Sequence, residues 1–298
     1  MAARRHTTMG LIALGLLGGG VLALVVAALA APTATLNALA ALRSQRQAQG
    51  LAYGALPRQR LDVYAPRSAA PPGGHPVVVF FYGGSWNRGE RSEYRFVGEA
   101  LAARGVLTLV ADYRLYPEVR YPDFLADCAQ ALAYGLTQAS TLGGNPKKVF
   151  VMGHSAGAYN AAMLALDPSR LAATGHAPSE LAGWIGLAGP YDFLPMTNLD
   201  ARPVFFHPDY PPGTQPLGLA SRNAPRSFLA APESDNLVNP VRNTEGLARR
   251  LRELGVTVEL HRYPRVNHLT LVGAMAPALS LLAPVLDDVV GFIQAGPR

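Results

Sequence analysis

Ser155 lies in the segment Gly-His-Ser-Ala-Gly at residues 153–157, which matches the pattern G-x-S-x-G. Residues 149–152 are apolar and β-rich, and the Ala-rich residues 156–166 are typical of a helix, so the motif is predicted to join a strand to a helix. A serine on such a sharp turn has its hydroxyl exposed at the helix N-terminus. A Cβ at either glycine would collide with the neighbouring strand or helix. The motif therefore predicts a nucleophilic serine, and the alternative is a purely structural turn.

A serine nucleophile needs a general base. His268 follows the predicted strand 256–263 in a loop before the terminal helical region, where its side chain can swing to Ser155. His261 lies inside that strand, where the sheet would hold it. His268 is therefore the predicted base, and the alternative is an exposed loop histidine. Two further histidines downstream of the motif fall in Pro- and Gly-rich connections and could line the entrance: His176 and His207.

The base needs an orienting carboxylate. Asp235 lies in the loop 232–238, directly after the predicted strand 227–231, and the apolar pair Leu237-Val238 could clamp that loop. Asp235 is the predicted acid, with Glu233 as the second candidate. Asp192 also follows a predicted strand and is expected to be a structural turn or a pocket residue.

The segment Tyr-Gly-Gly-Ser-Trp at residues 82–86 follows a continuous apolar run that is typical of a strand buried on both faces. Attack on an ester or amide carbonyl places negative charge on oxygen, and fixed backbone N–H groups are the usual way to stabilise it. Gly83 and Gly84 are predicted donors, with the N–H of Ala156 completing the oxyanion hole. The alternative for the two glycines is a plain strand-to-helix turn.

The composition is that of a compact, loop-rich enzyme. The chain has 298 residues, of which 49% are hydrophobic and 15% charged, with 30 Gly and 25 Pro, and this composition argues against disorder. Its net charge of +6 comes from arginines scattered in ones and twos without aromatic residues between them, so no nucleic-acid partner is predicted. The single cysteine, Cys128, excludes an internal disulfide and is predicted to be buried on a helix.

The N-terminus is predicted to be a membrane anchor or a signal segment, residues 1–31. A short basic stretch with Arg4 and Arg5 precedes residues 9–31, which carry no charge and are long enough to cross a bilayer. Ala28-Leu29-Ala30 also resembles a cleavage site, so the first alternative is a cleaved signal of a secreted protein. The second alternative is that the segment is a buried helix of a soluble protein. The arginines predict a cytoplasmic N-terminus and a periplasmic or extracellular catalytic domain. Residues 32–54 are predicted to be a linker and residues 55–298 the catalytic domain.

Strand-like and helix-like segments alternate through that domain. Strands are predicted at residues 58–64, 77–82, 106–111, 149–152, 181–187, 227–231 and 256–263, the first of them as an edge strand. Helices are predicted at residues 97–104, 124–137, 156–166, 244–254 and 284–295. This alternation predicts an α/β fold with a mostly parallel central sheet and helices on both faces.

Taken together, the motifs resemble those of α/β-hydrolase esterases of the hormone-sensitive-lipase and kynurenine-formamidase type. The matching segments are Tyr-Gly-Gly-Ser-Trp at 82–86, Asp-Tyr-Arg-Leu-Tyr-Pro at 112–117, Gly-His-Ser-Ala-Gly at 153–157, Asp235 before Leu-Val, and Val-Asn-His at 266–268. The resemblance implies the α/β-hydrolase fold over about residues 51–292. This chain has Tyr82 where such enzymes usually have histidine, and Ser85 in place of a third glycine. No cofactor is implied, and the HExxH, GxxxxGK[ST] and GxGxxG patterns are absent from the sequence.

The predicted function is hydrolysis of a small carboxylic ester by Ser155, His268 and Asp235 through an acyl-enzyme. The long connections 84–94 and 187–226 are expected to shape the pocket, and a short or aromatic acyl ester fits best. An amidase or arylformamidase with the same apparatus is the first alternative, and a catalytically inactive, membrane-anchored binding protein is the second. Four residues are predicted to line the substrate pocket: Trp86, His154, Tyr191 and Phe193.

Overall fold

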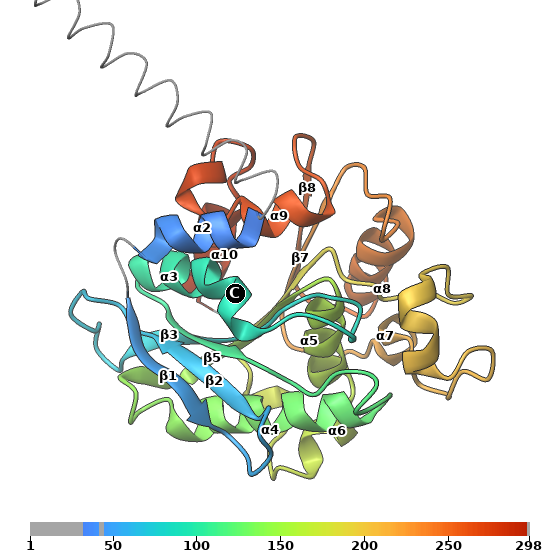
Figure 1. Cartoon of the computed structure of the whole chain (residues 1–298), viewed down its shortest axis with the longest axis horizontal. Helices are drawn as coiled ribbons and strands as arrows, with labels where there is room; N and C mark the ends of the chain where they lie inside the picture. Colours follow the sequence, from blue (N-terminus) through green and yellow to red (C-terminus); the bar gives the residue numbers. More distant parts are fainter. Residues whose placement is uncertain (1–31, 42–44, 297–298) are drawn as a thin grey trace, which may run out of the picture.

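The computed structural model describes residues 32–41 and 45–296. Within this part of the chain, eight strands form one sheet in the order β1-β2-β4-β3-β5-β6-β7-β8 (Figure 1). The strands are β1 (Arg46–Ala52), β2 (Arg60–Tyr64), β3 (His75–Phe81), β4 (Leu107–Ala111), β5 (Gly144–His154), β6 (Gly183–Leu187), β7 (Ser227–Pro232) and β8 (Val258–Tyr263). β1 and β2 pair antiparallel to their neighbours, and the remaining strands are parallel. The predicted α/β fold with a mostly parallel sheet is therefore confirmed.

Helices cover both faces of this sheet. They are α2 (Pro32–Ala41), α3 (Arg95–Ala103), α4 (Asp123–Gln138), α5 (Ala156–Leu166), α6 (Pro168–Ala172), α7 (Pro216–Leu219), α8 (Gly246–Glu253), α9 (His268–Gly273) and α10 (Val285–Gln294). In Figure 1, α3 and α10 lie on one side, with α2 packed against α3, while α4 and α6 lie on the opposite side. Every side chain of β3 is buried, as predicted for a central strand that is covered on both faces.

The strand order places the site. The chain passes from β3 to β4 on one side of β3 and then crosses from β4 to β5 on its other side, and loops at the carboxyl ends of parallel strands converge where the strand order reverses in this way. The loops that follow β3, β5, β7 and β8 carry the predicted oxyanion glycines, nucleophile, acid and base, respectively. The fold therefore collects four segments that are far apart in the sequence at one edge of the sheet.

The predicted strands and helices are all present with shifted ends, and two predictions about the N-terminal side of the domain were wrong. Residues 32–54, predicted as a linker, contain helix α2 and strand β1, and β1 is the true edge of the sheet. β2 is an inner strand, not an edge strand, because it pairs with β1 on one side and β4 on the other. Its polar residue Asp62 is fully buried and accepts hydrogen bonds from Arg91 and from the Gly50 N–H, both at 2.8 Å.

The predicted anchor or signal segment, residues 1–31, lies outside the described residues. Across residues 32–41 and 45–296, no helix has the length and apolar character that a membrane span requires.

Candidate active site

Ser155 occupies the sharp turn between β5 and α5. Its backbone has φ 54° and ψ −120°, a conformation that is unfavourable for a residue with a side chain and that occurs mainly at functional sites. The glycine at position 157 allows this turn, because a Cβ there would overlap the carbonyl of Phe81 at the end of β3. Likewise, a Cβ at Gly153 would overlap the backbone of Gly157. The predicted reason for both glycines is therefore confirmed.

The structure brings Ser155, His268 and Asp235 together. The Nε2 atom of His268 lies 2.8 Å from Ser155 Oγ, and its Nδ1 atom lies 2.7 Å from Asp235 Oδ2. His268 is the first residue of α9, and the side chain of Asn267 caps that helix by accepting from the N–H groups of Leu269 and Thr270. A base that is hydrogen bonded to both a hydroxyl and a carboxylate is arranged to take a proton from the hydroxyl.

The environment of Asp235 keeps its carboxylate charged. The side chain is fully buried, and burial by itself raises the pKa of Asp235. The hydrogen bond and charge of His268, together with the N–H groups of Val238 and Leu237, outweigh this effect of burial. The pKa of Asp235 therefore lies below its usual value. Those N–H groups donate to Oδ1 at 3.1 and 2.8 Å. The carboxylate is therefore held by the backbone of Leu237 and Val238, the pair that was predicted to clamp this loop.

His154, the residue before the nucleophile, does not line the pocket, although it was predicted to do so. Its side chain is buried, and Nε2 lies 2.9 Å from the backbone carbonyl oxygen of His268. A carbonyl oxygen only accepts, so Nε2 must carry the proton. Burial and the nearby charge of His268 lower the pKa of His154 to about 3. His154 is thus a neutral hydrogen-bond donor. It lies beneath the site because side chains alternate along β5 and that of His154 is directed away from Ser155.

The oxyanion loop, residues 82–89, carries the two predicted glycine donors and one further candidate. Gly83 lies against the nucleophile, since a Cβ built there would be 2.9 Å from the Cβ of Ser155. Among the described residues, the N–H groups of Gly84, Ser85 and Ala156 have no acceptor. Ser85 was missed, although it directly follows the glycine pair.

A cavity of about 390 Å³ opens onto the Ser155 hydroxyl. Two of the predicted lining residues, Trp86 and Phe193, form part of its wall. Tyr191 does not, because its side chain is fully buried against Trp184 behind the wall, with ring centroids 6.0 Å apart. Much of the wall comes from the two long connections that were expected to shape it. Other lining residues are Ser85, Arg88, Ala156, Pro190, Met196, Thr197, Asn198, Asp200, Ala201, Asn236, Leu237, Val238 and His268.

The remaining candidates have other contacts. Asp192 pairs with Arg242 through two hydrogen bonds of 2.9 and 3.0 Å, so it is a structural residue of the 187–226 connection. The second acid candidate, Glu233, is exposed. Neither entrance histidine lines the cavity next to Ser155; His176 binds Glu180 at 2.9 Å and His207 binds Tyr210 at 2.6 Å.

The sheet order and the serine, histidine and aspartate at its carboxyl edge define the class of this chain as an α/β-hydrolase. Among solved structures, Thermogutta terrifontis esterase 2 phosphonylated by sarin has the same fold, with a TM-score of 0.69 at 21% identity over 86% of this chain and 98% of that one. The family model named BD-FAE matches residues 61–251. The chain therefore belongs to the BD-FAE family.

Curated relatives are named as esterases. The probable isoprenylcysteine alpha-carbonyl methylesterase ICME of Oryza sativa subsp. japonica is 26% identical over 85% of this chain and 65% of its own length. Esterase LipC of Mycobacterium tuberculosis is 30% identical over 82% of this chain and 63% of its own length. This chain thus spans less than two thirds of these relatives. The resemblance to α/β-hydrolase esterases that the motifs indicated is confirmed.

Proposed function

We propose that this protein is a serine hydrolase that cleaves carboxylic esters through an acyl-enzyme. Ser155 Oγ attacks the carbonyl carbon while its proton passes to His268 Nε2. The oxyanion of the tetrahedral intermediate accepts hydrogen bonds from N–H groups in the set Gly83, Gly84, Ser85 and Ala156. The bond to the alcohol oxygen breaks as His268 returns the proton to that oxygen. Asp235 holds the imidazole in the required orientation throughout.

Water completes the cycle by the same route. A water molecule gives a proton to His268 Nε2 and attacks the acyl carbon, and collapse of the second intermediate returns that proton to Ser155 Oγ and releases the carboxylic acid. The observation that carries this proposal is the unbroken chain of contacts from Ser155 Oγ to His268 at 2.8 Å and on to Asp235 at 2.7 Å.

The cavity supports a short or aromatic acyl ester as substrate. Its lining combines apolar side chains, such as those of Trp86, Phe193 and Met196, with polar ones that include Arg88 and Asp200. A small pocket with both apolar and polar lining suits a compact ester better than a long acyl chain. The esterase names of the relatives support ester cleavage in general.

The first experiment compares the parent protein with Ser155→Ala on p-nitrophenyl acetate, butyrate and octanoate. The parent is expected to favour the shorter esters, and the variant should lose at least about 10⁴-fold in kcat with an unchanged circular dichroism spectrum. Ester hydrolysis that persists in Ser155→Ala at the parent rate would disprove the assignment of the nucleophile.

An N-formyl arylamine and a serine-directed phosphonate complete the assay. Faster cleavage of the formamide than of every ester would identify an arylformamidase on the same triad. Failure to hydrolyse either class, together with no phosphonate labelling of Ser155, would support a catalytically inactive binding protein.

We further propose that the N-terminal segment anchors the catalytic domain to a membrane, outside the cytoplasm. The support is in the sequence alone: residues 9–31 are uncharged and follow Arg4 and Arg5. The full chain should sediment with membranes in carbonate, and the chain lacking residues 1–31 should not. Recovery of both forms in the same soluble fraction would contradict a membrane anchor. The remaining interpretations of residues 1–31 would then be a cleaved signal segment or a buried helix.

A further inference from the structure

The backbone of the oxyanion loop requires support from its surroundings. Gly84, Ser85 and Trp86 have φ angles of 127°, 51° and 59°. Positive φ is unfavourable for residues with a side chain, and such residues persist where neighbouring contacts hold them. Trp86 is anchored from one side, since its indole Nε1 donates to Asn160 Oδ1 at 3.0 Å. The ends of the loop need a second anchor.

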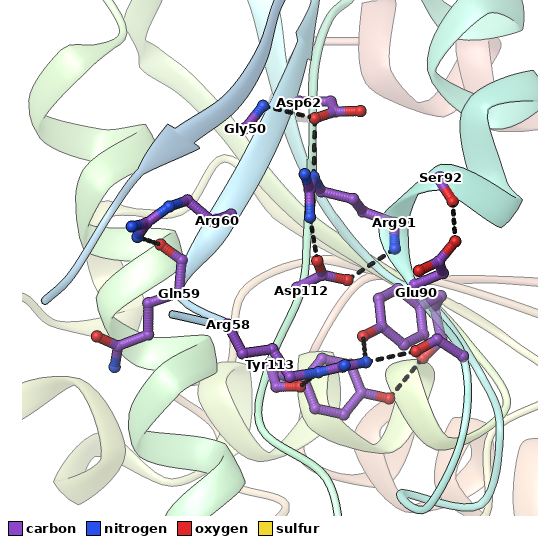
Figure 2. Close-up of polar contacts among 12 residues, drawn as sticks. Gly50, Arg58, Gln59, Arg60, Asp62, Glu90, Arg91, Ser92, Asp112 and Tyr113 are labelled. Atoms are coloured by element: carbon purple, nitrogen blue, oxygen red, sulfur yellow. Dashed lines mark hydrogen bonds and ion pairs between the residues drawn. The ribbon is translucent and has the colours of Figure 1, made fainter. Parts of the chain in front are cut away.

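The two ends of the loop meet at the side chain of Arg58. A Cβ built at Gly89 would lie only 2.9 Å from both the Gly83 carbonyl oxygen and the Tyr82 ring, so the loop closes tightly on itself. Arg58 Nη2 donates to the hydroxyl of Tyr82 at 3.0 Å and also to the carbonyl oxygen of Gly89. Its Nε donates to the carbonyl oxygen of Tyr113 at 2.7 Å, a contact drawn in Figure 2. One guanidinium thus joins both ends of the loop to the segment after β4.

Tyr82 is a rigid acceptor for this guanidinium. Its ring is fully buried and stacks between the rings of Tyr113 and Tyr94, with centroids 4.8 and 5.7 Å away. The hydroxyl of Tyr113 also donates to the Tyr82 carbonyl oxygen at 2.8 Å. Burial, and after it the negative charge of Asp112, raise the pKa of Tyr82 well above its usual value. The phenol is therefore neutral and keeps a lone pair for Arg58.

A buried ion-pair network continues from this point to the edge of the sheet (Figure 2). The Arg91 N–H donates to Asp112 Oδ1 at 2.7 Å, and the Arg91 guanidinium contacts both Asp112 and Asp62. Asp62 in turn accepts from the Gly50 N–H of β1 at 2.8 Å. Residues 89–91 are consequently held against β1 and β2. The hydrogen bonds of Arg58 to Gly89 and Tyr82 then hold the oxyanion loop relative to these strands.

We propose that Arg58 and Tyr82 are positioning residues for the oxyanion hole. The Arg58 guanidinium holds Tyr82 and Gly89 together, and this contact keeps the Gly84 and Ser85 N–H groups directed at the substrate oxygen. Neither side chain lines the cavity, so they act on the rate of the chemical step and not on substrate binding. The proposal rests on the proposed ester hydrolysis and adds to it the residues that set its rate.

The test compares Arg58→Met and Arg58→Lys with a matched control, Arg60→Met, in the full chain. Arg60 Nη1 also donates to three backbone carbonyls, those of Gly54, Leu56 and Gln59, but none belongs to the oxyanion loop. Removing one oxyanion donor costs about 100- to 1000-fold in rate, so displacing the loop should lower kcat on p-nitrophenyl acetate by about 10- to 100-fold, with KM changed less than about threefold.

Arg58→Lys should recover part of kcat, because an ammonium keeps the charge but cannot hold two acceptors in a fixed fork. Arg60→Met should retain the parent kcat. Equal kcat in Arg58→Met and Arg60→Met, at a temperature where circular dichroism shows both folded, would overturn the proposal. A rise in KM without a fall in kcat would overturn it as well.

A second variant covers the case in which Arg58→Met does not fold. Tyr82→Phe removes only the hydroxyl acceptor and keeps the stacked ring, so kcat should fall by about 3- to 10-fold. The parent kcat in Tyr82→Phe would overturn the assignment of Tyr82.

The rate constant for phosphonylation of Ser155 is measured in parallel, since the phosphoryl oxygen occupies the same hole. If the parent cleaves no ester but reacts with the phosphonate, the proposed substrate class fails. The effect of Arg58→Met on the phosphonylation rate then decides the positioning role by itself, with an unchanged rate overturning it.

Discussion

His154 Nε2 lies 2.9 Å from the backbone carbonyl oxygen of His268, so the residue before the nucleophile supports the backbone of the base. This contact requires a neutral, buried imidazole, and burial lowers the pKa of His154 to about 3 from 6.5. Between these two pH values the unfolded chain binds a proton that the folded chain does not bind. The free energy of unfolding should therefore fall as the pH drops from 6.5 toward 3, by up to about 1.4 kcal/mol per pH unit.

Urea unfolding at pH 7 and pH 5 measures this effect. His154→Gln keeps a donor for the His268 carbonyl but has no titrating group. The parent should lose about 2 kcal/mol more than this variant between the two pH values. The same loss in both proteins would show that other groups cause the acid sensitivity.

The acid of the triad gives the second prediction. Asp235→Asn removes the charge that orients His268 Nδ1–H, so kcat should fall by about 10⁴-fold with little change in the folded structure. The matched control is Glu233→Gln, two residues earlier in the same loop, whose side chain is exposed and whose replacement should leave kcat unchanged. Steady-state kinetics on one short ester checks both variants, and a larger loss in Glu233→Gln than in Asp235→Asn would exchange their roles.

Much of this architecture could be predicted from the sequence because its strongest signals are local. The apolar run of β3 is explained by the lack of solvent on either face of that strand, and the structure confirms this. The glycines around Ser155 are explained by the lack of room for a Cβ, which the structure also confirms. β1 was missed because its sequence, Arg-Gln-Ala-Gln-Gly-Leu-Ala, is polar and contains a glycine. That strand depends on pairing with β2, and on contacts such as the Gly50 N–H to Asp62, which a local pattern does not contain.

The details of the site were less predictable for a related reason. Which N–H of the oxyanion loop is free depends on consecutive φ angles at Gly84, Ser85 and Trp86, and the glycine pattern indicates only that the turn is tight. Similarly, His154 precedes the nucleophile and Tyr191 follows the cavity residue Pro190, yet the side chains of both are buried in the core. Nearness along the chain could not show on which side of the backbone each ring lies.

Two glycines provide a prediction about stability. A Cβ at Gly157 would overlap the carbonyls of Phe81 and Tyr82, whereas a Cβ at Gly291 in α10 would meet no atom within 4 Å. Gly157→Ala should therefore force α5 away from β3 and destabilise the fold by about 3 kcal/mol or more. Gly291→Ala should stabilise it by about 0.5–1 kcal/mol, because alanine favours a helix. Thermal unfolding of both variants tests this, and similar Tm values would mean that α5 has room to move.

The last prediction concerns acyl specificity. Phe193 lies on the cavity wall and packs against Trp86 and Phe205, with ring centroids 6.4 and 5.3 Å away. Phe193→Ala should open this wall and raise the ratio of kcat/KM for octanoate over acetate esters by at least about tenfold, since each added methylene that finds an apolar site is worth about 0.8 kcal/mol. Tyr191→Phe is the control: its ring lies behind the wall, so the ratio should not change. A shift in Tyr191→Phe but not in Phe193→Ala would place the acyl chain elsewhere.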